Sequence, residues 1–271
     1  MKIERKFEEL KRKEEGAYMP HIYYGDPSSE FSLKLVEILI ENGADFLEFG
    51  IPFSDPTADG PVFQESCERA LNNGITPEKC LEGIEEIRSI GYSIPIILTT
   101  YFNIPYKYGI QDFFDRLSKL DVQGIIVPNM PPEEVGVFEK KADEAEIDII
   151  FQVTPNTNEK RLKSILKKSS GFLYVINFEG VTGIRESIGQ STLTLIKRIR
   201  ENSDIPLLAG FGISEPSQAE KLISEGADGV ITGSAIAKLY RKEAGAPEAG
   251  LNKVKKFALK IKKGCIEGYR R

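Results

Sequence analysis

Two carboxylic acids, Glu48 and Asp59, lie close together in the sequence but in surroundings of different kinds. Glu48 interrupts the apolar run "DFLEFGI", whereas Asp59 follows in a turn-rich segment, "SDPTADG". A carboxylate buried in an apolar strand is costly unless it is paired or neutralised, and desolvation raises its pKa towards neutrality. Two acids in unlike environments can take separate acid and base roles. The pattern therefore predicts acid–base chemistry centred on Glu48.

Each acid also has a purely structural interpretation. A buried Glu48 would be satisfied by hydrogen bonds to backbone groups. Asp59 would only cap the amino terminus of a helix formed by "PVFQESCERAL". The residues alone favour catalysis at Glu48 and leave both interpretations of Asp59 open.

Eight short apolar segments alternate with amphipathic segments of helical period. The apolar segments are residues 19–24, 45–50, 94–100, 124–128, 147–153, 172–177, 205–210 and 229–233. Such alternation predicts a parallel sheet covered by helices. Eight units without a linker favour a (β/α)8 TIM barrel, with an extra N-terminal helix, over an open doubly wound sheet. We expect one domain spanning residues 1–271.

The expected strand ends narrow the chemistry further, because active sites of such barrels lie at the carboxyl ends of the strands. None of these ends carries a lysine, which disfavours Schiff-base catalysis. His21 is the only histidine and the three cysteines are scattered, so no metal-ligand spacing is present. His21 lies in the first expected strand. It has two interpretations: an imidazole that lines the barrel core, or a side chain that contacts a ligand at the barrel mouth.

Glycine-rich loops after the last strands predict a phosphate site. Gly212 lies in "AGFGIS" after the seventh strand, and Gly233 and Ser234 open a helix after the eighth. Glycine lets the backbone approach a ligand closely, and the amino terminus of a helix attracts anions. "GVTG", residues 180–183, would add a third glycine-containing loop to this phosphate site, after the sixth strand.

Composition indicates a protein of the reducing interior of the cell. The net charge of the 271 residues is −5, and acids and bases are interspersed, which argues against nucleic acid or an anionic membrane as a partner. No apolar run is long enough to span a bilayer, and the charged segment 1–16 is a helix rather than a signal peptide. We expect a cytoplasmic location, with the lysine-rich segment 252–271 as a solvated helix.

The run "GIPFSDPTADGPVFQ" resembles the signature of the tryptophan synthase alpha subunit family, which reads close to P-F-S-D-P-x-A-D-G-P. Further family-like motifs follow in order: "GDP" (25–27), "TYFN" (100–103), "PPEE" (131–134), "TPNT" (154–157), "GVTG" (180–183), "GFGIS" (210–214) and "GADGVITGSAI" (226–236). They extend over nearly the whole chain. The sequence is thus identified as an archaeal-like, somewhat divergent member of this family.

The resemblance implies a retro-aldol cleavage of indole-3-glycerol phosphate to indole and glyceraldehyde 3-phosphate. It implies that Glu48 moves protons at indole C3 and at the glycerol hydroxyl, and that Asp59 stabilises the indolenine-like intermediate through the ring N–H. Tyr174 matches an active-site tyrosine of the family. These roles fit the chemistry, since cleavage at an aromatic carbon requires that carbon to be protonated.

The resemblance also implies the remaining contacts and the partner. Thr182 matches a loop threonine that meets the aspartate on closure. Gly183, Gly212, Gly233 and Ser234 match phosphate contacts. No metal or organic cofactor is expected in this chain; pyridoxal phosphate would belong to a beta subunit, which would receive the indole in an α2β2 heterotetramer.

Several positions depart from the usual family pattern, namely His21, Tyr23, Thr99 and Asn129. The segment "VINFEGVTG" also lacks the common Ser-Arg before its loop. These departures leave open a divergent paralogue that acts on another phosphorylated substrate, or a mainly non-catalytic activator of a beta subunit. A barrel isomerase or prenyl-type transferase that uses the same phosphate site would need paired acids on different strands or an Mg²⁺-binding acid near the first strand, for which Asp26 is the only candidate.

Overall fold

The computed structural model describes residues 2–176, 188–210, 212–241 and 247–270. All strands run parallel, in the order β5-β4-β3-β2-β1-β9-β8-β7-β6. Their bounds are β1 (Ala17–Tyr23), β2 (Leu47–Gly50), β3 (Ile96–Thr99), β4 (Gly124–Ile126), β5 (Asp148–Ile149), β6 (Gln152–Val153), β7 (Leu173–Ile176), β8 (Leu207–Gly210) and β9 (Gly229–Thr232).

The fifth predicted strand, residues 147–153, is divided into β5 and β6, which differs from the single strand expected. β5 pairs with β4, while β6 pairs with β7 on the other side. Between them the Ile150 amide still donates to Ile125, whereas the Phe151 carbonyl already accepts from Tyr174. This one stretch therefore closes the circle of strands, and the predicted TIM barrel is confirmed.

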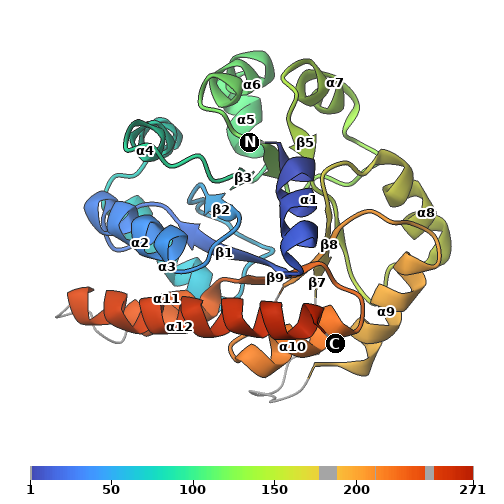
Figure 1. Ribbon diagram of the computed structural model, residues 1–271. Helices are drawn as coiled ribbons and strands as arrows, with labels where there is room; N and C mark the ends of the chain where they lie inside the picture. Colours follow the sequence, from blue (N-terminus) through green and yellow to red (C-terminus); the bar gives the residue numbers. More distant parts are fainter. Residues whose placement is uncertain (1, 177–187, 211, 242–246, 271) are drawn as a thin grey trace.

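Helices surround the strands (Figure 1). They are α1 (Ile3–Lys13), α2 (Ser29–Glu41), α3 (Pro61–Asn72), α4 (Pro77–Ser89), α5 (Asn103–Tyr108), α6 (Ile110–Lys119), α7 (Gly136–Glu144), α8 (Glu159–Lys168), α9 (Gln190–Arg200), α10 (Pro216–Ser224), α11 (Ser234–Arg241) and α12 (Pro247–Tyr269). The lysine-rich C-terminal segment forms the predicted helix: α12 lies along α10 and α11 (Figure 1). Among the described helices, none is long and apolar enough to cross a bilayer.

Alternation along the strands separates two apolar layers. Leu47 and Phe49 of β2 face outward into the large core between strands and helices. Glu48 lies between them in the sequence and so points into the barrel. A smaller cluster fills the barrel interior, and Phe46 and Phe172 belong to it.

The extra helix α1 is part of the interior cluster. Its apolar side chains Ile3, Phe7 and Leu10 pack there, with the ring centroids of Phe7 and Phe46 4.9 Å apart. Charged residues of this helix remain at the surface. The helix fills the barrel beyond the amino-terminal ends of the strands, where Ile3 lies beside Gly124. The opposite, carboxyl end remains for a binding site.

Leu10→Ala should destabilise the protein strongly, since Leu10 is 3% exposed and packs inside the barrel. Truncating a buried leucine typically costs about 2–5 kcal/mol. Urea unfolding should show this loss, whereas Glu8→Ala, on an exposed position of the same helix, should change the free energy of unfolding by less than about 0.5 kcal/mol. Equal stabilities of the two variants would contradict a packing role for α1.

Candidate active site

A cavity of about 210 Å³ opens at the carboxyl ends of the strands. Six residues singled out from the sequence line it together: Glu48, Asp59, Tyr174, Gly212, Gly233 and Ser234. They come from four strands or the loops that follow them, as far as 186 residues apart in the chain (234 − 48). Because all parallel strands end on the same side of the barrel, the fold alone brings them to one place.

Glu48 is almost completely buried, with 2% of its surface exposed. Its Oε1 accepts a hydrogen bond of 2.7 Å from Thr99 Oγ1 and lies 3.2 Å from Nδ1 of His21. Burial raises the pKa of Glu48 to about 8, against the opposing effect of the Thr99 hydrogen bond. Glu48 therefore carries its proton at neutral pH, as an acid ready to donate it.

Asp59 is held by two phenols. Its Oδ2 accepts hydrogen bonds from Tyr23 at 2.7 Å and from Tyr101 at 2.8 Å. Burial raises the pKa of Asp59, while both phenols oppose the rise by stabilising the ionised form. The Tyr101 hydroxyl also accepts from the Ala58 amide and so fixes the loop beside the acid.

The alternative interpretation of Asp59 as a helix cap is wrong. The N-cap of α3 is Gly60, and no side chain caps this helix. Gln64 of α3 reaches back to the Asp59 carbonyl, at 2.8 Å, and leaves the carboxylate to the phenols and the cavity. Asp59 is thus directed into the site rather than into the helix.

Tyr174 contributes a buried hydroxyl from β7. Burial raises its pKa well above the ordinary value, with smaller contributions from Glu48 and Asp59, so it stays protonated. The ring fills the space beside Gly210, where a Cβ would come within 2.5 Å of the tyrosine oxygen. A glycine on β8 is therefore required for Tyr174 to lie in the barrel.

The amino terminus of α11 forms one wall of the cavity. Gly233 precedes the helix and Ser234 begins it, and a Cβ at position 233 would lie 2.5 Å from Phe63. Gly212, on the neighbouring loop, has a φ of +75°, a conformation that favours glycine. Free amide groups at this helix end suit an anion such as phosphate. Thr182 and Gly183, predicted for the same region, lie outside the described residues.

Sequence reasoning missed Lys238 and the partnership of Tyr101 with Asp59. Lys238 lines the cavity from α11. Its position four residues after Ser234 places both on one face of the helix, and this spacing was the available signal. Tyr101 follows the third strand directly, so its place at the mouth could be read, but its hydrogen-bond partner could not.

The four departures from the family pattern fall in different places. His21 and Thr99 line the cavity beside Glu48, and Tyr23 contacts Asp59. Asn129 lies away from this cavity: its Oδ1 accepts from the Phe102 amide at 2.9 Å and supports the loop after β3. Three of the four therefore change the surroundings of the two acids.

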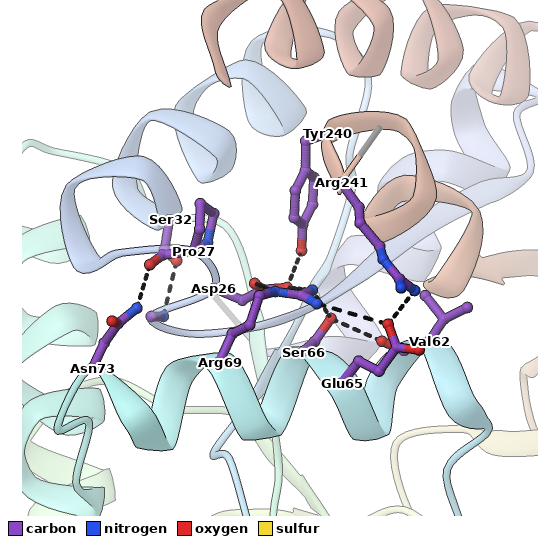
Figure 2. Close-up of polar contacts among 11 residues, drawn as sticks. Asp26, Pro27, Ser32, Val62, Glu65, Ser66, Arg69, Asn73, Tyr240 and Arg241 are labelled. Atoms are coloured by element: carbon purple, nitrogen blue, oxygen red, sulfur yellow. Dashed lines mark hydrogen bonds and ion pairs between the residues drawn. The ribbon is translucent and has the colours of Figure 1, made fainter. Parts of the chain in front are cut away.

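Asp26 is fully buried, and its carboxylate is already bound (Figure 2). Arg69 of α3 donates two hydrogen bonds, of 2.7 and 2.9 Å, and Tyr240 of α11 donates a third, of 2.8 Å. Both oxygens thus serve to join two helices, and Asp26 does not line the cavity. The isomerase or transferase alternative loses its only candidate for an Mg²⁺-binding acid. Across the described ranges, no three His, Cys, Asp or Glu side chains gather as metal ligands.

The fold and the site together define a class: a (β/α)8 barrel with two carboxylic acids in a cavity at the carboxyl ends of its strands, beside the amino terminus of a helix. Residues 7–265 match the family described as Tryptophan synthase alpha chain. The chain belongs to this family, and the predicted activity class, a carbon–carbon lyase of tryptophan biosynthesis, is confirmed with it.

Relatives and solved structures agree with this assignment. The chain is 39% identical to the tryptophan synthase alpha chain of Methanopyrus kandleri over 99% of its own length and 96% of the relative's. It is 43% identical to that of Methanocaldococcus jannaschii, over 89% and 85% of the two chains. The crystal structure of the alpha chain from Legionella pneumophila superposes with a TM-score of 0.87 at 29% identity, covering 97% and 96%.

Glu48→Gln should remove a pH-dependent loss of stability. The ordinary pKa is 4.5 and the folded value about 8. Below the lower value Glu48 is protonated in both states; between the two values only the unfolded state ionises, so folding weakens as pH rises, by a few kcal/mol overall. Urea unfolding from about pH 5 to 9 should show this decline in the native protein and a flatter profile in the variant.

The exposed position Glu8 provides the matched control for this measurement. Glu8→Gln should follow the native profile across the whole range. Parallel profiles for the native protein and Glu48→Gln would show that Glu48 ionises alike in the folded and unfolded states.

Proposed function

We propose that this chain cleaves indole-3-glycerol phosphate to indole and glyceraldehyde 3-phosphate, with Glu48 and Asp59 as its catalytic acids. One observation carries the proposal: a buried acid that is protonated at neutral pH shares a cavity with a second acid whose carboxylate accepts hydrogen bonds from two phenols. Family membership supplies the substrate, and the cavity supplies the groups that its cleavage requires.

Glu48 would act first as acid and then as base. Its proton passes to C3 of the indole ring, which gives a ring cation and a Glu48 carboxylate. The carboxylate then takes the proton of the glycerol hydroxyl on the adjacent carbon. The C–O double bond of the aldehyde forms, the carbon–carbon bond breaks, and its electron pair restores the neutral indole. Glu48 is protonated again at the end of the cycle.

Asp59 would stabilise the ring cation through the indole N–H. The two phenols that bind its Oδ2 favour the ionised form and fix the carboxylate in place. A fixed anion that faces a developing positive charge lowers the barrier without reorganisation during the reaction. Tyr174, whose hydroxyl stays protonated, would complete the wall beside the substrate.

The phosphate of the substrate would lie at the amino terminus of α11, against Gly233 and Ser234. Gly212 forms the neighbouring edge of the cavity, and the Lys238 ammonium adds a positive charge on the same helix. This supports the phosphate contacts that the sequence suggested. Thr182 as the closing residue and Gly183 as a further phosphate contact stay predictions.

The cofactor and the partner are inferred from the family. We place pyridoxal phosphate in a beta subunit rather than in this chain, and an α2β2 heterotetramer as the working assembly. The chain is similar in fold to a chain from crystals of tryptophan synthase from M. tuberculosis, with a TM-score of 0.86 at 28% identity. The beta subunit would receive the indole released here.

Glu48→Gln should lower kcat for indole release by about 10²–10⁴, because the amide cannot supply the proton. Affinity for glycerol 3-phosphate, measured by calorimetry, should be kept, since the proposed phosphate contacts come from α11 and the loop after β8 rather than from Glu48. Indole release from indole-3-glycerol phosphate, with and without a beta subunit, is the measurement.

Two other outcomes of that experiment favour the alternatives. No indole from the native protein, even with a beta subunit present, would point to a divergent paralogue with another phosphorylated substrate. Unchanged activity of Glu48→Gln, with activation of a beta subunit retained, would support a mainly non-catalytic activator.

Lys238→Ala should raise KM roughly tenfold with little change in kcat, because a phosphate contact is present in both ground state and transition state. Steady-state kinetics with indole-3-glycerol phosphate test this. Lys255→Ala, an exposed lysine on α12, is the control and should behave as the native protein. An unchanged KM for Lys238→Ala would remove this lysine from the phosphate site.

A further inference from the structure

His21 and Thr99 hold the same oxygen of Glu48 from opposite sides. Thr99 Oγ1 lies 2.7 Å from Oε1 and His21 Nδ1 lies 3.2 Å from it. The three residues come from adjacent strands: His21 is the register partner of Glu48 across β1 and β2, and β3 carries Thr99. All three are buried, so the Thr99 hydrogen bond and the His21 contact take the place of bonds that water would have made.

The other ends of the same groups are unsatisfied. Glu48 Oε2 and His21 Nε2 are buried and have no hydrogen-bond partner among the described residues. Both residues line the cavity. Buried polar atoms are almost always paired, so two unpaired atoms on residues of one cavity indicate places that a ligand satisfies.

The available donors then indicate which of the two Glu48 oxygens carries the acidic proton. The Thr99 hydroxyl donates to Oε1, and a carbonyl-type oxygen has a second lone pair for the Nδ1–H of His21. Burial lowers the pKa of His21 to about 3, so the imidazole is neutral and carries a single ring proton. Placing that proton on Nδ1, 3.2 Å from Oε1, lets Oε1 accept from both neighbours and leaves the acidic proton of Glu48 on Oε2.

We propose that His21 and Thr99 are positioning residues that hold Glu48 by Oε1 and thereby make Oε2 the only atom that transfers protons to and from the substrate. This inference rests on the function proposed above and adds His21 and Thr99 to the residues that the proposed reaction depends on. It gives a use to two of the positions at which this chain departs from the family pattern. A freely rotating carboxyl would present either oxygen, and a proton on Oε1 would be directed at His21 instead of the substrate.

The same contacts stabilise the carboxylate that Glu48 becomes after it has donated its proton. Donors to the charged form lower a pKa, so the removal of Thr99 Oγ1 should raise that of Glu48. Other titratable or charged groups around the cavity are His21 on β1, Asp59 after β2, Tyr174 on β7 and Lys238 on α11. Tyr23 and Tyr101 complete the set through their bonds to Asp59.

Thr99→Val tests the hydroxyl with almost no change of shape. We expect kcat to fall about tenfold at unchanged KM, and the alkaline limb of the kcat profile to move up by about one pH unit. Thr100→Val is the matched control: Thr100 is the next residue, is buried, and its Oγ1 has no partner in the described structure. This control should keep the native profile. An unmoved alkaline limb in Thr99→Val would overturn the proposal.

His21 is tested by two variants. His21→Phe removes the Nδ1 donor and should lower kcat about 10–100-fold, whereas His21→Asn keeps an N–H near the same place and should recover most of that loss. Circular dichroism and thermal melting verify that both variants fold. Equal losses in the two variants, or a change in KM alone, would overturn the positioning role.

A substrate-free readout keeps the two proposals distinguishable. In Thr99→Val, the pH at which the decline in stability ends, relative to Thr99→Val/Glu48→Gln, should move upward by the same one unit, while its onset at the unfolded pKa stays in place. If the native protein releases no indole but this shift is present, the proposed substrate is wrong, while the positioning of Glu48 through its Oε1 is supported. If indole is released but Thr99→Val shifts neither the kcat profile nor the stability profile, only the proposed positioning of Glu48 is wrong.

Discussion

Burial of the Glu48 carboxyl inside the barrel is the constraint on which the rest of the site depends. Alternation along β2 sends its apolar neighbours outward to the helices and leaves the acid facing inward. Burial disfavours the charged form, so the acid keeps its proton at neutral pH. The barrel accepts this polar group because Thr99 and His21 contact one of its oxygens and because the acid stays neutral. A proton donor is thus produced by position rather than by any special residue type.

The second acid complements the first. Two ionised carboxylates in one cavity would repel each other, and the charge of Asp59 does raise the pKa of Glu48. The protein resolves the conflict by giving Asp59 two phenol donors on Oδ2, while Oε2 of Glu48 has no partner in the described part of the chain. Asp59 thus has two donors that favour its ionised form against the effect of burial, whereas Glu48 remains a neutral donor. This difference between the two acids is what the roles proposed for Glu48 and Asp59 require.

Most of the fold followed from hydrophobic periodicity, because each strand is buried on both faces and each helix on one. The first and last residues of β2, β7 and β9 lie within two residues of the expected ends. The break between β5 and β6 was not predicted, since it depends on where the chain changes partner from β4 to β7. That change is set by closure of the whole barrel and leaves no local signal in the seven residues concerned.

The site was predictable to the extent that it depends on strand ends, and unpredictable where it depends on side-chain partners. Asp26 shows the difference: the sequence offered it as a metal ligand, but Arg69 and Tyr240, 43 and 214 residues away, bind its carboxylate. This contact has a consequence for the cavity. Helix α3 begins directly after Asp59 and α11 begins at Ser234. Because one buried carboxylate joins both helices (Figure 2), it also fixes how far the second acid lies from the amino terminus of α11.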